Sequence, residues 1–328
     1  MELNIKLLQL GKVGKIRYEK RLSYQKVMTD LSEAVIRQFG YTDVLGWSYS
    51  RYSTFSSCKR QYYYEKYAKY DLAGDLMQTR KLAQLTTVPL EIGNISHKIL
   101  QTLLRRLQKS SDEIDPERFF DYAHRAAESI FRSKLFDEVY YGVRESIDFE
   151  IEIYEPVRQA LENFLRSERL QWIFEEALVT KDEWVIEPDG FGELRIDGLK
   201  AYCKVDFLFP IGDEMYILDW KTGKEDYKKH RVQLHGYAYW ANYHFEKEYS
   251  LIEATVAHLL PGYKEHSQRI NEFDVQEFSD VVRSQTEEMY SLCAEPELNI
   301  PLPKDEFRMT PHGNFCKTCK FRELCDRK

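Results

Sequence analysis

The stretch that most constrains the fold is a pair of alternating apolar runs within residues 204–221, which reads KVDFLFPIGDEMYILDWK. The runs flank a Gly-Asp pair at 212–213, a dipeptide typical of the two-residue turn of a β-hairpin. With this pair as the turn, Asp206 falls directly opposite Asp219. The sequence therefore predicts an antiparallel hairpin with one defined register.

Side chains alternate between the two faces of a strand, so Asp206, Asp219 and Lys221 share one face of this hairpin. Lys204 is expected opposite Lys221. The other face is apolar and is predicted to be a core surface that fixes the register; it carries Val205, Phe207, Phe209, Tyr216, Leu218 and Trp220. A slip of one residue would bury the charges instead.

Two opposed carboxylates on neighbouring strands lie about 5 Å apart, which is costly unless a cation sits between them. A hard divalent ion with oxygen ligands, such as Mg²⁺ or Mn²⁺, meets that need. A metal beside the Lys221 ammonium group suits phosphodiester hydrolysis, because the metal activates water and the lysine stabilises developing charge. The alternative interpretation is a surface hairpin with cross-strand ion pairs.

Composition indicates a globular chain without a membrane span. Of its 328 residues, 43% are hydrophobic and 31% are charged. No apolar run approaches the ~20 residues that a membrane helix needs. The first residues, MELNIKLLQLGKVGK, lack a signal-peptide core, so a cytoplasmic location is expected. Six cysteines in such a chain favour free thiols or metal ligands over disulfides.

Charge is unevenly distributed along a chain whose net charge is −7. Residues 111–179 carry 17 acidic and 8 basic side chains and are predicted to be largely helical, with Pro116 and Pro156 in first turns. We interpret residues 111–178 as a helical insertion. Residues 51–70 carry five basic side chains and one acidic side chain, so a local basic surface is compatible with the acidic total.

Residues 47–70 interleave these basic side chains with seven tyrosines and two other aromatic residues. Ser50 is a plausible cap for a short helix that ends near Cys58. The mixture suits base stacking and backbone contacts on a single nucleic-acid strand. Burial in the core is the favoured interpretation for most of the tyrosines, since large aromatic side chains are usually buried.

Other segments predict a mixture of helices and strands. Residues 91–109 have helical periodicity, carry His97 and have Asn94 or Ser96 as a candidate cap. The pattern further predicts a strand at 2–8, a helix at 22–38, a meander of antiparallel strands over 179–223, a helix at 228–245, a strand at 251–260 and a helix at 273–292. The phosphate-loop pattern G-x-x-x-x-G-K-[ST] is absent, because Ile16 follows Lys15.

The C-terminal tail holds a dense cysteine set, Cys316-x2-Cys319-x5-Cys325. Three thiolates are one short of a tetrahedral metal site. The fourth ligand would come from Cys58, Cys203, Cys293 or His312.

Taken together, the motifs resemble the PD-(D/E)XK nuclease superfamily in its RecB-like branch, which includes the AddB nuclease domain, exonuclease V and the nuclease of CRISPR spacer acquisition. The resemblance runs from about Ser48 to Cys325. The motifs follow the family's order: Cys58 after a serine-rich helix start, G-x-x-x-H from Gly93 to His97, Val205-Asp206, the D-x-K of Asp219 to Lys221, Q-x-x-x-Y from Gln233 to Tyr237, and the three cysteines of the tail.

The resemblance implies an α/β fold of the restriction-endonuclease type, with a mixed sheet flanked by helices. It implies an N-terminal extension over 1–46 and a nuclease domain over 47–328, with a catalytic core at 179–270. Metal ligands would be His97, Asp206, Asp219 and the backbone carbonyl of Trp220. The remaining implied roles are catalysis by Lys221, positioning by Gln233 and Tyr237, and an accessory acid at Glu187, for which Glu193 competes. Val205 replaces the motif's proline.

The resemblance also implies an iron–sulfur staple that joins the two ends of the nuclease domain through Cys58, Cys316, Cys319 and Cys325. By count alone, four cysteines suit a [4Fe–4S] cluster or zinc equally, and the family favours the cluster. Cys203 and Cys293 would be buried or free thiols.

The function implied is a metal-dependent DNA nuclease, most naturally an exonuclease on single-stranded ends in repair, recombination or phage- and CRISPR-related processes. The alternative is a DNA-end-binding subunit of a helicase or adaptation complex whose cutting is latent. RNA remains open as a substrate. The chain carries no helicase motif, so unwinding would require another protein.

Overall fold

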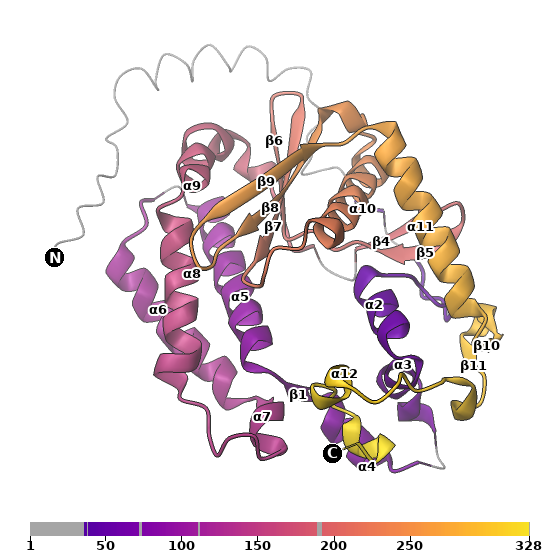
Figure 1. Ribbon diagram of the computed structural model, residues 1–328. Coiled ribbons are helices and arrows are strands. Elements are labelled where there is room, and N and C mark those ends of the chain that lie inside the picture. The colour runs from indigo at the N-terminus through magenta and orange to yellow at the C-terminus, as the bar shows by residue number, and fades with distance from the viewer. Residues whose placement is uncertain (1–35, 38, 72–73, 111, 189–191, 328) are drawn as a thin grey trace, which may run out of the picture.

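The computed structural model describes residues 36–37, 39–71, 74–110, 112–188 and 192–327, and it is built around a five-stranded mixed sheet (Figure 1). The strand order is β3-β6-β7-β8-β9. The strands are β3 (Val185–Ile186), β6 (Phe207–Ile211), β7 (Glu214–Lys221), β8 (Ile252–His258) and β9 (Lys264–Arg269). Only the β7–β8 pair is parallel, so the sheet is mixed and the predicted α/β class is confirmed.

The hairpin of β6 and β7 has the predicted register. Ile211 pairs with Glu214 around the 212–213 turn, and the ladder runs back to the pair Phe207 and Leu218. The ladder ends there, one residue before Asp206. The predicted pairs of Asp206 with Asp219 and of Lys204 with Lys221 are therefore not part of the ladder. On the other edge of β7, Lys221 pairs with His258 of β8.

Both faces of the sheet are covered, which the hairpin alone did not predict. On one face Leu208, Met215 and Ile217 pack in a core with α10 (Tyr227–Phe245) and α11 (Glu272–Tyr290). On the other face Phe207 and Leu218 pack in a second core with α5 (Val88–Lys109), α6 (Pro116–Arg132) and α8 (Glu155–Leu165). The strand that carries Asp219 is therefore central and enclosed by helices on both sides (Figure 1).

The predicted single meander over 179–223 is wrong. β4 (Glu193–Ile196) and β5 (Leu199–Tyr202) form a separate two-stranded sheet, whereas β3 pairs directly with β6. This small sheet is extended by a bridge from Trp47 to Ala201. The excursion from 192 to 203 thus leaves the main sheet and returns to it at Phe207.

Helix starts differ from two predictions. Ser48, not Ser50, caps α2 (Tyr49–Ser57), and its hydroxyl accepts the amide of Arg51. α5 begins at Val88 with a proline in its first turn, so Asn94 and Ser96 lie inside the helix and are not caps. The predicted helices at 228–245 and 273–292 are confirmed as α10 and α11, and the strand at 251–260 is β8.

The acidic region is helical, as predicted, and comprises α6, α7 (Asp137–Tyr140), the π-helical turn η2 (Phe149–Tyr154), α8, α9 (Glu168–Trp172) and η3 (Ile173–Ala177). Pro116 and Pro156 stand in the first turns of α6 and α8. The predicted strand at 2–8 and most of the predicted helix at 22–38 lie outside the described residues; Ile36 and Arg37 are described and are not helical. The boundary at residue 46 stays a prediction.

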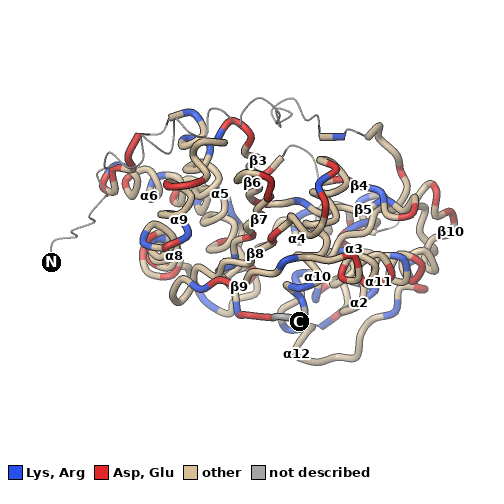
Figure 2. The backbone as a smooth tube through the Cα atoms, turned by 90° about the horizontal axis from the view of Figure 1, so that it is seen from above, with Lys and Arg blue, Asp and Glu red and all other residues tan. Residues whose placement is uncertain are grey.

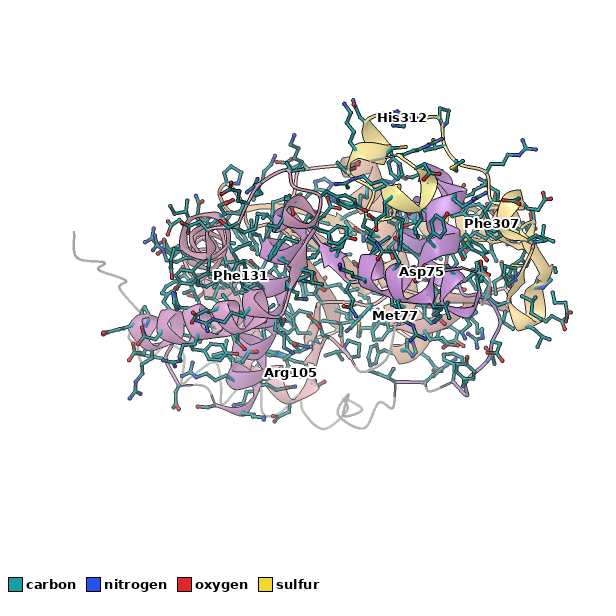
Figure 3. The ribbon with its side chains drawn as sticks, turned by 90° about the horizontal axis from the view of Figure 1, so that it is seen from below. Asp75, Met77, Arg105, Phe131, Phe307 and His312 are labelled. Atoms are coloured by element: carbon teal, nitrogen blue, oxygen red, sulfur yellow. The ribbon has the colours of Figure 1, made fainter. Side chains whose placement is uncertain are left out.

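The C-terminal segment packs against the first helices of the described chain. Tyr63 of α3 (Lys59–Lys66) contacts Phe307, with ring centroids 5.1 Å apart. Figure 3 shows Phe307 on the yellow C-terminal segment beside the purple helices. Four tyrosines, Tyr62, Tyr63, Tyr64 and Tyr67, are buried in this region, which confirms the core interpretation for them.

A buried ion pair holds this segment in place. Arg322 Nη1 donates to both carboxylate oxygens of Asp137, at 3.1 and 2.9 Å. Both residues are buried, and the Arg322 guanidinium also covers the ring of Tyr141. No helix within the described part of the chain is long and apolar enough to cross a membrane.

We expect Asp137→Ala to lower the free energy of unfolding by about 3–5 kcal/mol, because it leaves the Arg322 charge buried without a partner. The control is Arg283→Ala, which breaks exposed ion pairs with Asp197 and Asp280 and should cost less than about 1 kcal/mol. Urea denaturation measures both. Equal losses in the two variants would show that the Arg322–Asp137 pair does not anchor the C-terminal segment.

Candidate metal-dependent active site

The end of β7 places two charged side chains in direct contact. The Lys221 Nζ atom lies 2.5 Å from the Asp219 Oδ2 atom. Asp219 is only 1% exposed. From α10, the Tyr237 hydroxyl donates to Asp219 Oδ1 at 2.7 Å. Asp219 is therefore held on one side by the lysine and on the other by the tyrosine.

A second set of contacts joins His97 to the same strand. His97 Nδ1 lies 3.3 Å from Asp206 Oδ2, and His97 Nε2 lies 2.8 Å from the carbonyl oxygen of Trp220. The Trp220 amide donates to Asp206 Oδ2 at 3.0 Å. The histidine, the aspartate before β6 and the backbone of β7 thus converge on one spot.

The G-x-x-x-H spacing on α5 has a physical reason in this contact. Gly93 and His97 are four residues apart, so they share one face of the helix. A Cβ atom at Gly93 would lie 3.2 Å from the Thr222 hydroxyl oxygen, just after β7. Glycine therefore lets α5 approach the end of β7 closely enough for His97 to reach Asp206 and Trp220.

Glu187 joins this cluster, and Glu193 does not. One ligand atom each from His97, Glu187 and Asp206 lies within 4.8 Å of the others. The Glu187 backbone has a φ of 38°, an uncommon conformation for a residue other than glycine, and its amide donates to the Asp206 carbonyl at 2.9 Å. Glu193 instead pairs with Arg195, with 2.5 Å between charged atoms.

Two polar residues that the motifs did not identify also contact Glu187. Gln101 Nε2 donates to Glu187 Oε2 at 3.0 Å, and Lys204 Nζ lies 3.5 Å from the same oxygen. Gln101 follows His97 by one helical turn, a spacing that could have indicated it. Among the described residues, the Gln233 Oε1 atom is buried without a hydrogen-bond partner.

Protein charges only partly compensate the two carboxylates. Burial raises the pKa of Asp219, and the neighbouring Lys221 offsets only part of that rise. At Asp206 burial also opposes ionisation, but contact with His97 outweighs it and lowers the pKa of the carboxyl group. Burial opposes the charge of Lys221, yet Asp219 and Asp206 raise the pKa of its ammonium group. The Asp219 anion is thus under-compensated, which a bound cation would relieve.

The four motif cysteines line one small cavity, although Cys58 and Cys316 are 258 residues apart in the chain. The space measures about 20 Å³ and is bordered by Cys58, Cys316, Cys319 and Cys325. Arg327 Nη1 donates to Cys316 Sγ at 3.1 Å. His312, at the outer rim of the C-terminal segment in Figure 3, does not border the cavity, and neither do Cys203 and Cys293.

The spacing of the sulfur atoms bears on what this cavity could hold. All six cysteines are free thiols. Among the described residues, no three cysteine sulfurs lie within 4.8 Å of one another. A tetrahedral zinc site with Zn–S bonds of about 2.3 Å would bring its sulfurs to roughly 3.8 Å from one another. No three of the described cysteine sulfurs are that close to one another.

Comparison with known proteins identifies the family. No curated protein matches the chain. A crystal structure described as a "Putative exonuclease" from Eubacterium rectale is 11% identical, covers 74% of this chain and 79% of that one, and has a TM-score of 0.42. The crystal structure of SSO0001 is 14% identical, covers 70% of this chain and 97% of that one, and has a TM-score of 0.28.

The family model described as the PD-(D/E)XK nuclease superfamily matches residues 46–326. That span includes the sheet, the cluster around Asp206 and Asp219 and the cysteine cavity. The chain belongs to the PD-(D/E)XK nuclease superfamily.

Proposed function

We propose that the chain is a metal-dependent deoxyribonuclease that acts on single-stranded ends, in the RecB-like branch of its superfamily. The observation that carries the proposal is the convergence of His97, Asp206, Asp219 and Lys221 at the end of β7. The donor set of one imidazole and several carboxylates suits Mg²⁺ or Mn²⁺. His97, Asp206 and Glu187 would hold the ion, with Asp219 and the Trp220 carbonyl beside them.

When bound, the divalent ion would polarise the scissile phosphate and lower the pKa of a bound water. The side chains of the protein would donate protons and position the reacting groups. The Lys221 ammonium group stands where it can donate to the attacking water or to a phosphate oxygen. Tyr237 fixes the Asp219 carboxylate through its hydroxyl, and Gln233 offers a buried amide for positioning.

The depth of the site supports a single strand as the substrate. The side chains of His97, Asp206 and Lys221 are 26%, 15% and 23% exposed, and Asp219 is almost fully enclosed. A phosphate must therefore reach partly buried side chains where α5 meets β7. A frayed or single-stranded end can bring its backbone to such side chains more readily than an intact duplex can.

The cysteine cavity supports a [4Fe–4S] cluster as a structural staple. Cys58 and the three cysteines of the C-terminal segment border one space, and no three of their sulfurs lie within 4.8 Å of one another, which suits a polynuclear cluster better than a single zinc ion. The role proposed for the cluster is to hold α2 and α3 against the C-terminal segment, beside the Arg322–Asp137 ion pair.

Asp219→Ala and Lys221→Ala should each lower the rate of single-stranded DNA degradation by at least about 10²–10³-fold, the usual cost of losing a group that stabilises transition-state charge. The matched controls are Asp213→Ala in the hairpin turn and Lys304→Ala at the surface, which should cut normally. The measurement is degradation of end-labelled DNA with Mg²⁺ or Mn²⁺, with thermal melting as a fold check. Full activity in both active-site variants would exclude this site.

Glu187→Gln should raise the Mn²⁺ concentration needed for half-maximal cleavage by about 10–100-fold, since it removes charge beside the metal ligands. Glu193→Gln is the matched control and should leave the metal titration unchanged. Calorimetric Mn²⁺ binding without DNA gives an independent reading. A larger effect from Glu193→Gln would reassign the accessory acid.

Protein purified without oxygen should be brown and contain about four irons per chain. Cys58→Ala should lose the iron and melt at a lower temperature, whereas Cys203→Ala and Cys293→Ala should keep the iron. Metal analysis and absorption spectra measure this. Colourless protein with one zinc per chain would replace the cluster by a zinc staple and leave the nuclease assignment intact.

A further inference from the structure

A large cavity of about 1040 Å³ lies beside the catalytic cluster and is not used by the chemistry described above. Its described lining comes from residues 36–37 and 39–44, from α3, from the β4–β5 sheet and from residues 298–301. Two stretches of chain connect it to the active site: the lining residue Pro188 directly follows Glu187, and Tyr202 precedes Asp206 by four residues. Four residues span at most about 14 Å, so the cavity and the catalytic carboxylates are close neighbours.

Two cations of this cavity have only neutral partners among the described residues. Lys200 is 6% exposed, and its Nζ atom donates to the Thr42 carbonyl and hydroxyl oxygens at 2.9 and 3.0 Å. Arg51 Nη1 donates to the Gly46 carbonyl at 2.7 Å. Removing a cation from water without an opposite charge is costly, so this recess favours an anionic ligand.

The carboxylates that border the cavity already have partners. Asp43 accepts the Tyr41 hydroxyl at 2.7 Å. Glu65 accepts the Gln61 amide at 3.2 Å, and Glu193 pairs with Arg195. Among the described residues, the ion pairs of Glu65 and Glu193 are with Lys66 and Arg195, and none of these acids pairs with Arg51 or Lys200.

Both cations lie near the same aromatic ring. The Arg51 guanidinium lies 5.0 Å and the Lys200 ammonium 5.7 Å from the centre of the Tyr202 ring. Phe39, Tyr41 and Trp240 also border the cavity. Figure 2 shows basic segments beside β4 and β5, where this ring is carried. Basic side chains combined with aromatic rings are the usual means of holding an unpaired strand, through its phosphates and its bases.

At about 1040 Å³ the cavity lies at the upper end of the range of about 300–1,000 Å³ for single-ligand pockets, so its cations and aromatic rings, and not its size, favour a strand. We propose that this cavity binds the single strand of DNA that leads into the catalytic cluster, with Arg51 and Lys200 contacting phosphates and the aromatic rings contacting bases. The inference rests on the proposed nuclease function and extends it, since it assigns the path of the strand to the active site and the residues that bind the strand.

The test measures binding of labelled single-stranded and duplex oligonucleotides by fluorescence anisotropy, in the full chain made inactive by Asp219→Ala. The double variant Arg51→Gln/Lys200→Gln should bind single-stranded DNA at least tenfold more weakly and leave duplex binding unchanged. Its salt dependence should fall by about 0.7 in log–log slope for each lost phosphate contact. The matched control Arg132→Gln/Lys304→Gln removes two exposed cations elsewhere and should bind as the parent does.

Lys200 is buried, so the double variant is checked by thermal melting, and Arg51→Gln alone serves as a second variant. It should show about half the change in salt slope. As a direct reading, iododeoxyuridine placed a few nucleotides from the labelled end should crosslink to Tyr202 or a neighbouring lining residue. Crosslinks confined to other surfaces, or unchanged affinity and slope in folded variants, would overturn the inference.

The outcomes separate this inference from the proposed function. If a folded Arg51→Gln/Lys200→Gln variant degrades DNA normally and binds the strand as before, only the proposal that the cavity binds the strand is refuted. If the wild-type chain never cuts DNA but the variant loses strand binding, the nuclease proposal is refuted. Strand binding by the cavity is then still supported. Binding of a free deoxynucleoside monophosphate as tightly as the strand would show a mononucleotide site and overturn the strand path.

Discussion

The ion pair between Lys221 and Asp219 is the interaction on which the rest of the structure depends. It places a cation and an anion 2.5 Å apart at the end of the central strand, where water is largely excluded. Such a pair survives only with further hydrogen bonds. Tyr237 supplies one from α10, and His97 supports the neighbouring Asp206 from α5. The two helices on opposite faces of the sheet thus meet at one charged site.

The hairpin could be predicted because two independent signals agreed. Strand alternation sets which side chains share a face, and the Gly-Asp turn sets the register. The separate β4–β5 sheet could not be predicted in the same way. Alternation of apolar and polar side chains indicates a strand but does not indicate which strand it pairs with. The same limit explains the enclosed hairpin: α10 and α11, which cover its second face, come from residues after 226.

Local sequence patterns also left two residues possible for the helix cap and two for the accessory acid. Ser48 and Ser50 both suit a helix cap, and only backbone geometry selects Ser48. Glu187 and Glu193 both follow the expected order, but the left-handed backbone at Glu187 turns it toward His97 and Asp206, while Glu193 lies in β4 beside Arg195. The structure brings the motif residues His97, Asp206 and Asp219 together, as the family motifs predicted. Contacts across distant segments, such as Gln101 with Glu187, required the folded chain.

The central claim is that this cluster holds a divalent ion at the end of β7. Crystals soaked in Mn²⁺ and measured for anomalous scattering test it most directly. The account predicts a single strong peak within bonding distance of His97 and Asp206, on the side of the cluster that faces Glu187. A map with no peak there, or with Mn²⁺ bound only at other surface carboxylates, would contradict it.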